Sequence, residues 1–146
     1  MLFTTTNAAR ILNALKVSEV RVLANVVLVR FKNQDGVKCA TYVSKNAFRD
    51  EFVRFRADRG AELVAQGDVV ESEAGFYVSG SNDVYEVVLT ADGVECPCHD
   101  LKFQKEAFGG NGVCYHGYAA LKMVGFSRLS DYVQAQKSFA AEYKVA

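Results

Sequence analysis

The amino-acid sequence predicts an α+β fold in which antiparallel hairpins are combined with helices. Val-rich extended segments are separated by short turns such as Asn33-Gln34-Asp35-Gly36, a pattern that favours hairpins. Other segments carry apolar residues at helical spacing. No strand–helix–strand pattern typical of a parallel sheet is evident, so the sheets are expected to be antiparallel.

Residues 1–67 are predicted to form an α+β segment that begins with a helix and a β-hairpin. Thr6 is suited to cap the helix. The apolar residues that then recur at helical spacing are Ala8, Ile11, Leu12 and Leu15. A Val-rich strand over residues 19–31 is expected to return through the turn at 33–36 into a second strand over residues 37–43.

A basic helix is predicted to complete this segment. Ser44 can cap it, and Gly60 is expected to end it just after residue 59. Phe48, Phe52 and Phe55 lie on one stripe of this helix. The adjacent basic stripe fits either the solvated flank of a core helix or a face that contacts phosphates. Its members are Lys45, Arg49, Arg56 and Arg59.

Residues 68–126 are predicted to contain short strands followed by a helix. The strands are expected over residues 69–70, 76–78, 84–89 and 94–96, with Gly-containing turns between them. A helix over residues 113–124 is expected after a loop at 109–112. Residues 127–146 form a third segment with a helix over residues 130–143. The three segments are expected to pack as one compact unit.

The charges are unevenly distributed along the chain. Its 17 basic and 17 acidic side chains give a formal net charge of zero. Residues 1–60 nevertheless carry 11 basic and 5 acidic side chains, residues 61–100 carry 9 acidic and no basic ones, and residues 101–146 carry 6 basic and 3 acidic ones. Local charge governs the attraction of a polyanion, so a nucleic-acid partner is not excluded. Solvated surface is the alternative explanation.

Composition excludes several classes of protein. Half of the 146 residues are hydrophobic, which excludes a disordered chain. No apolar run reaches about 18 residues, and the N-terminus lacks the features of a signal peptide. We therefore expect a cytoplasmic protein, or a nuclear one in a eukaryote, with thiols or metal ligands rather than disulfides. Cys39 has no spaced partner and is expected to be a small buried residue.

Three of the four cysteines and one of the two histidines lie in one short segment. Cys96 and Cys98 form a C-x-C pair, and after fifteen residues Cys114 and His116 form a C-x-H pair. Three thiolates and one imidazole are the ligands of a structural tetrahedral Zn²⁺ site with no position left for water. His99 is the alternative histidine ligand, although C-x-H already completes the set.

This segment and its flanks resemble the SWIM zinc finger in a small stand-alone form. The resemblance runs from about residue 76 to residue 126 and includes Tyr85-Glu86-Val87-Val88-Leu89, Gly93-Val94-Glu95-Cys96 and Cys114-Tyr115-His116-Gly117-Tyr118-Ala119-Ala120-Leu121. It implies a zinc-stapled ββα finger with Cys96, Cys98, Cys114 and His116 as ligands of one structural zinc. Gly117 departs from the pattern, since the family usually has an apolar residue there. Because glycine is a poor helix former, we expect it to weaken the first turn of the helix.

The sequence favours a binding module over an enzyme. It contains no G-x-x-x-x-G-K, H-E-x-x-H or G-x-S-x-G motif. Known SWIM proteins are DNA-binding or protein-binding modules, so the resemblance implies a non-catalytic module that binds nucleic acid, DNA first, or serves in a DNA-processing complex. The alternative is a protein–protein adaptor that uses the acidic residues 61–100. No membrane or small-molecule substrate is expected. The candidate nucleic-acid contacts are Lys45, Arg49, Arg56, Arg59, Lys102, Lys105 and Lys122.

Overall fold

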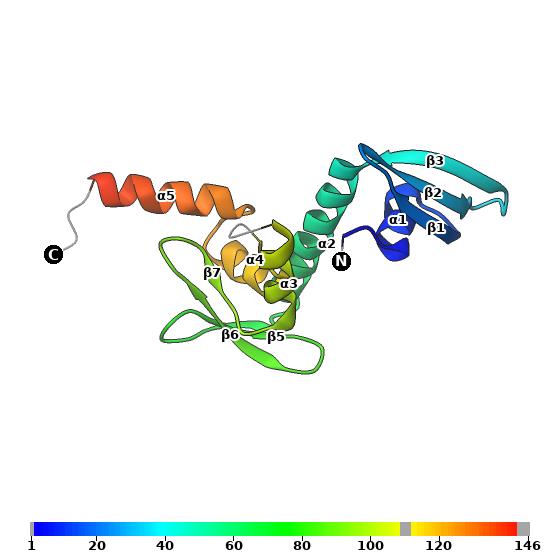
Figure 1. Cartoon of the computed structure of the whole chain (residues 1–146). Coiled ribbons are helices and arrows are strands. Elements are labelled where there is room, and N and C mark those ends of the chain that lie inside the picture. Colours follow the sequence, from blue (N-terminus) through cyan, green and yellow to red (C-terminus); the bar gives the residue numbers. More distant parts are fainter. Residues whose placement is uncertain (1, 109–111, 143–146) are drawn as a thin grey trace. The chain divides into compact units, whose positions relative to one another are not determined.

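The structure, a computed structural model, describes residues 2–108 and 112–142 (Figure 1). Their contacts divide the chain into two compact units, Met1–Phe55 (unit 1) and Arg56–Ala146 (unit 2). The boundary falls inside helix α2 (Lys45–Ala65). Each unit contains one antiparallel sheet together with helices, which confirms the predicted α+β class with antiparallel pairing.

Unit 1 is a three-stranded antiparallel sheet with helices packed on one face. Helix α1 (Thr5–Leu12) precedes strands β1 (Lys16–Val22), β2 (Val26–Lys32) and β3 (Lys38–Ser44), and the sheet order is β1-β2-β3. The start of α2 completes the unit. Its core consists of Ala8, Val27, Val29, Val43 and Phe48.

The strand predicted over residues 19–31 is in fact two strands. A tight turn at Ala24 and Asn25 separates β1 from β2, and the Leu23 amide donates to the Val26 carbonyl over 2.9 Å. This turn was not predicted, because valines lie on both sides of it and the whole Val-rich segment is typical of a single strand. The predicted hairpin turn at residues 33–36 is confirmed. Strand β2 pairs antiparallel with β3, and the pair nearest the turn is Lys32 with Lys38.

The first helix begins and ends earlier than predicted. Thr4 caps α1 instead of Thr6, because its hydroxyl accepts the Asn7 amide over 3.1 Å. The helix ends at Asn13, whose φ of 48° places it in the left-handed region. Leu15 consequently lies outside the helix and is 61% exposed.

Helix α2 starts where predicted and continues past the predicted stop. The Ser44 hydroxyl accepts the Ala47 amide over 3.0 Å. Gly60 lies inside the helix, and a Cβ there would lie 2.7 Å from the Ala119 amide nitrogen. Gly60 therefore allows a close approach of two helices, while Gly67, with a φ of 76°, provides the actual C-terminal turn.

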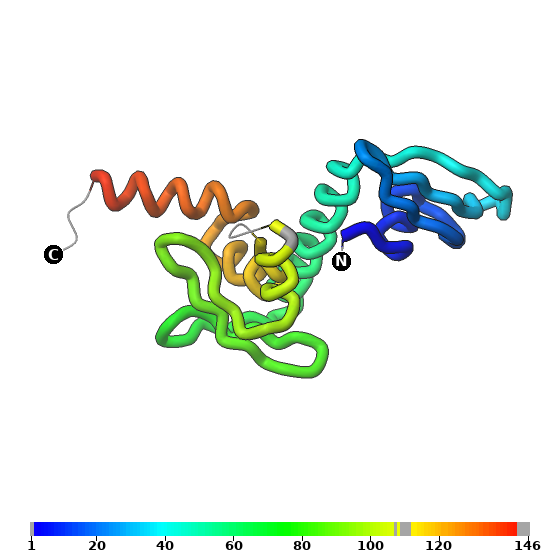
Figure 2. The backbone as a smooth tube through the Cα atoms, viewed as in Figure 1, coloured from blue at the N-terminus to red at the C-terminus, as the bar shows by residue number. Residues whose placement is uncertain are grey.

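Unit 2 contains a four-stranded antiparallel meander (Figure 2). Its strands are β4 (Val69–Glu71), β5 (Phe76–Ser79), β6 (Val84–Leu89) and β7 (Val94–Glu95). These strands agree with the predicted ones to within a residue at each end; Cys96, predicted to end the last strand, directly follows β7. The inner face packs on helices in a core of Leu63, Val69, Val78, Val87, Val94, Val113, Ala119, Ala120, Leu121 and Tyr132.

Three helices follow the meander. They are α3 (His99–Phe108), α4 (Tyr115–Met123) and α5 (Leu129–Glu142). Helix α3 was not expected, because from the sequence the segment with Lys102 and Lys105 between the two ligand pairs reads as a loop. Tyr132 of α5 donates its hydroxyl to the Thr90 carbonyl over 2.8 Å and so ties the start of this helix to the sheet.

Parts of two predictions fall outside the described residues, namely positions 109–111 of the predicted loop and residue 143 of the last helix. The division into segments 1–67, 68–126 and 127–146 that pack as one compact unit stays a prediction. Among the helices within residues 2–108 and 112–142, none combines the length and apolar character needed to cross a bilayer.

Candidate metal centre

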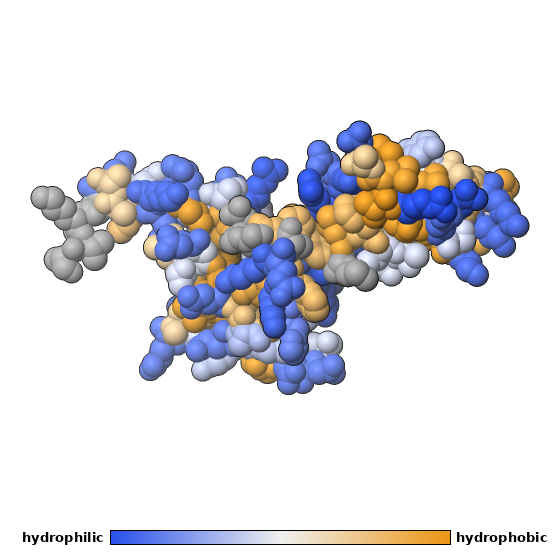
Figure 3. Space-filling view, viewed as in Figure 1, coloured by the Kyte–Doolittle hydropathy of each residue, from blue (hydrophilic) through white to orange (hydrophobic). Residues whose placement is uncertain are grey.

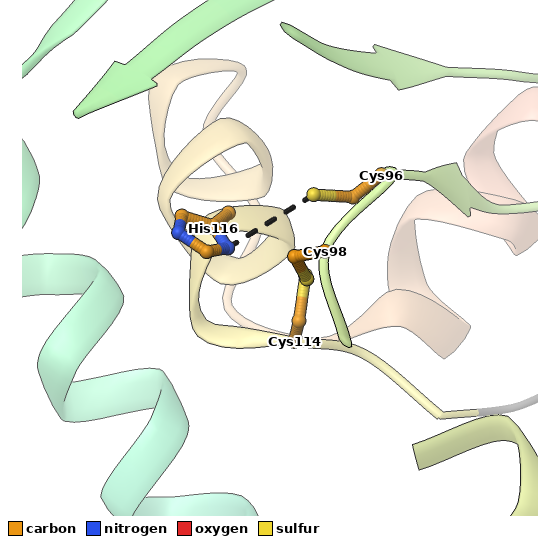
Figure 4. A group of neighbouring side chains, drawn as sticks. All are labelled: Cys96, Cys98, Cys114 and His116. Atoms are coloured by element: carbon orange, nitrogen blue, oxygen red, sulfur yellow. Dashed lines mark hydrogen bonds between the residues drawn. The ribbon is translucent and has the colours of Figure 1, made fainter. Parts of the chain in front are cut away.

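Four side chains of unit 2 converge on one point (Figure 4). Cys96, Cys98, Cys114 and His116 each offer one ligand atom, and these atoms all lie within 4.8 Å of one another. The Cys98, Cys114 and His116 side chains are buried and Cys96 is half-buried. The four residues predicted from spacing are therefore brought together, and they can hold a metal ion.

The two ligand pairs come from different elements. Cys96 lies directly after β7, and Cys98 follows it at the start of α3. Cys114 and His116 lie at the start of α4. Cys96 Sγ and His116 Nδ1 are 3.9 Å apart, the contact drawn in Figure 4. A single ion bound here would therefore join the end of the meander to two helices.

Cys98 and Cys114 use their sulfurs as helix caps. Cys98 Sγ accepts the Leu101 amide, and Cys114 Sγ accepts the Gly117 amide, both over 3.3 Å. Each sulfur thus lies at the N-terminus of a helix, α3 or α4, where backbone amides and the helix dipole stabilise negative charge. These amide contacts stabilise the thiolate, the form of cysteine that binds metals.

The three thiols also perturb one another. The hydrogen bonds that Cys114 and Cys96 make to Cys98 lower the pKa of Cys98. Contacts with Cys96 and Cys98, followed by burial, raise the pKa of Cys114. At Cys96 the Cys114 contact lowers the pKa, but the Cys98 contact and burial offset it and raise the pKa to about 11. Negative charge therefore concentrates on Cys98, and ionising all three thiols calls for a cation among them.

Aromatic side chains surround the histidine. The ring centroids of Tyr85 and Tyr115 lie 4.8 and 4.0 Å from that of His116. The imidazole is 1% exposed, and its buried Nε2 has no hydrogen-bond partner among the described residues. Burial raises the pKa of the Tyr115 hydroxyl, and the nearby Cys98 raises it further. A bound metal would offset the cost of burying this imidazole.

Gly117 is required by the packing of the site. A Cβ at Gly117 would lie 2.8 Å from Val113 Cγ1 and 2.9 Å from Val94 Cγ1. The departure from the SWIM pattern, interpreted from sequence as a weakness of the helix, thus lets α4 approach β7 closely. The Gly117 amide is also the donor to Cys114.

An ion pair that the sequence did not indicate holds α3 beside the site. Arg56 of α2 donates Nη2 to Asp100 Oδ1 over 2.9 Å, and its Nε lies 3.2 Å from both carboxylate oxygens. The two side chains are only 18% and 21% exposed. Asp100 lies two residues after Cys98, so this pair positions the helix that Cys98 caps. Arg56 and Asp100 are far apart in the sequence, and only a prediction of helix α3 could have indicated that they meet.

The predicted nucleic-acid contacts are distributed over both units, and each has its own local surroundings. Arg56 is engaged with Asp100, and Arg59 forms an exposed pair with Glu62 at 3.0 Å. Lys45, in unit 1, donates to the Ala24 carbonyl over 2.9 Å. Of the others, Arg49 contacts Asn46, while the exposed Lys102 and Lys105 lie on α3 and Lys122 on α4.

The other cysteine and the other histidine lie outside the cluster. His99 is exposed, and the only cluster of this type among the described residues does not include it. Cys39 is half-buried in β3, and its thiol contacts the Val37 carbonyl at 3.5 Å. Cys39 was expected to be a small buried residue and is only half-buried, on an edge strand of its sheet.

Comparison with known proteins found no matching family model, no matching curated protein and no matching solved structure.

Proposed function

We propose that this protein is a non-catalytic zinc-binding module of SWIM type that binds nucleic acid, DNA first, or serves in a DNA-processing complex. The observation that carries the proposal is the convergence of three sulfurs and one imidazole within 4.8 Å. The order of the ligands along the chain supports the SWIM assignment, as does the hairpin β6–β7 before them and helix α4 after them.

Zinc is the metal that best suits this donor set. Soft thiolates with an imidazole in a four-donor set favour Zn²⁺ over the hard cations Mg²⁺ and Ca²⁺, which take oxygen ligands. Four protein donors complete a tetrahedron, so no position is left for a substrate or a reactive water. The role of the ion is then structural: it fixes β7, α3 and α4 to one another.

The nucleic-acid part of the proposal is supported by charge. Residues 1–60 carry 11 basic and 5 acidic side chains. A salt titration tests it: the zinc-bound protein is mixed with labelled duplex and single-stranded oligonucleotides at increasing salt. We expect log affinity to fall linearly with log salt, with a slope that corresponds to several released counterions. Absence of binding at low salt, with zinc bound, overturns this part.

One observation favours a protein-binding adaptor as a second candidate. The outer face of the unit 2 sheet exposes Val70, Tyr77 and Val84, which are 61%, 47% and 61% exposed. Glu86 lies beside Tyr77 on the same face. Such an apolar patch with an acidic neighbour suits a partner with basic and apolar side chains.

The two candidates differ in what the variant Val70→Ser/Val84→Ser does. If the protein is an adaptor, this variant loses its protein partner in a pull-down from the native host performed after nuclease treatment. If it binds nucleic acid, the variant keeps the salt-dependent affinity of the parent. Both positions are exposed, so the change leaves the core of unit 2 intact.

A further inference from the structure

The outer face of the unit 1 sheet is basic. Strand register places Lys16, Lys32 and Lys38 directly opposite one another across the three strands. Arg30 and Arg21 lie on the same face, one and two rows further along. The only acidic side chain on this face is Glu19, and it pairs with Arg21 at 2.6 Å and Arg30 at 3.0 Å.

The three lysines form a row without a counter-charge. All three are exposed, and none forms an ion pair with any residue in the described ranges 2–108 and 112–142. Like charges directly opposite one another destabilise a sheet. Neighbouring strands lie about 4.8 Å apart, so the row spans roughly 10 Å. It borders a hollow of about 490 Å³ that is also lined by Arg30 and Ser18. An anion with several charges would relieve this repulsion.

An exposed aromatic side chain lies on the same face. Tyr42 of β3 is 67% exposed and pairs across the sheet with Leu28. It lies four residues from Lys38 along the strand, about 13 Å away at the usual rise of a strand. Figure 3 shows hydrophilic and hydrophobic side chains adjacent to one another over the strands of unit 1.

We propose that this outer face of β1–β2–β3 binds single-stranded nucleic acid, with the lysine row on the phosphates and Tyr42 stacked on a base. The inference rests on the nucleic-acid part of the proposed function and assigns it a surface outside the metal-binding segment. Cationic grooves combined with exposed aromatic rings are the usual means of binding single strands. An acidic peptide would use the lysines but gains nothing from a stacking ring. Bases in a duplex have no open face for Tyr42.

The test compares two matched triple variants of the zinc-bound protein. Lys16→Gln/Lys32→Gln/Lys38→Gln removes the row, and Lys102→Gln/Lys105→Gln/Lys122→Gln removes three exposed lysines from unit 2. Affinity for a fluorescent thymidine oligonucleotide, its duplex form and a poly-glutamate chain is measured by anisotropy at several salt concentrations. The row variant should bind the single strand roughly tenfold to a hundredfold more weakly at low salt, with a salt slope lower by about 2.

Tyr42→Ala tests the stacking contact separately. We expect it to weaken single-strand binding roughly tenfold and to leave the salt slope unchanged, because the ring carries no charge. Tyr77→Ala, at an exposed tyrosine of the other sheet, serves as the control and should bind like the parent. Thermal unfolding of the row variant should show equal or greater stability, since the lysine repulsion is gone.

The outcomes separate this inference from the proposed function. If the parent binds oligonucleotides and the unit 2 variant loses affinity while the row variant does not, the surface is wrong and the function stands. Tighter binding of the duplex, or equal binding of poly-glutamate, also overturns the single-strand assignment. If the parent binds no nucleic acid at low salt with zinc present, the nucleic-acid function itself fails, and this inference fails with it.

Discussion

At the scale of single residues, the ligands were predictable and their surroundings were not. Cys96, Cys98, Cys114 and His116 follow from spacing, because a chain with four cysteines rarely gathers three beside a histidine without a reason. Gly117 was misread, since helix propensity alone makes glycine a defect. The structure shows that Val94 and Val113 leave no room for a side chain at position 117.

Gly117→Ala therefore tests the packing of the site. The extra methyl group would overlap two valine side chains, at a cost of about 1–3 kcal/mol that exceeds the roughly 1 kcal/mol gained in helix propensity. We expect a lower midpoint in chemical unfolding of the zinc-bound protein. Gly93→Ala is the matched control, because a Cβ at Gly93 meets nothing within 4 Å. A Gly117→Ala protein as stable as its parent contradicts the packing account.

At the scale of elements, the meander was predictable because its strands are short, Val-rich and bounded by turn residues. Helix α3 was not predicted. Among its described side chains the buried ones are Leu101 and Gln104, and a glutamine in the sequence does not indicate a buried position. The turn between β1 and β2 was missed for the opposite reason, since apolar residues continue on both sides of Ala24 and Asn25. Periodicity fails where a buried position is polar or a turn lacks glycine and proline.

The ion pair between α2 and α3 provides a prediction at this scale. In a double-mutant cycle, Arg56→Ala and Asp100→Ala should show a coupling energy of about 1–3 kcal/mol, because the pair is multiply hydrogen-bonded and largely shielded from water. The exposed pair Arg59–Glu62 on the same helix is the control, with an expected coupling below about 0.5 kcal/mol. Equal coupling energies in the two cycles would show that the Arg56 pair does not hold α3.

At the scale of the whole molecule, the two units should depend differently on the metal. Unit 1 has a core of its own and offers no cluster of metal ligands among its described residues. Unit 2 joins its sheet and two helices through the Cys₃His cluster. Structural zinc supplies on the order of 10 kcal/mol of apparent folding free energy in small domains. Loss of the proposed zinc ion should therefore destabilise unit 2 and leave unit 1 largely folded.

Chelation followed by hydrogen exchange tests this difference. Removing zinc should expose the amides of unit 2 to rapid exchange, including those of Leu101 and Gly117, which donate to the sulfurs. Amides in the hydrogen-bonded strands β1–β3 should keep their protection. Returning zinc should restore the original pattern. Uniform loss of protection in both units, or no loss in either, would contradict a metal role confined to unit 2.

We expect the Cys₃His cluster to hold one structural zinc ion. Elemental analysis of carefully purified protein measures this directly, with His116→Ala and Cys114→Ala compared against His99→Ala and Cys39→Ala, which change the same residue types outside the cluster. We predict one zinc per chain in the parent and in both controls, and loss of zinc together with a lower melting temperature in both cluster variants. Less than half an equivalent in the parent, or cluster variants that keep their zinc and their stability, would contradict the claim.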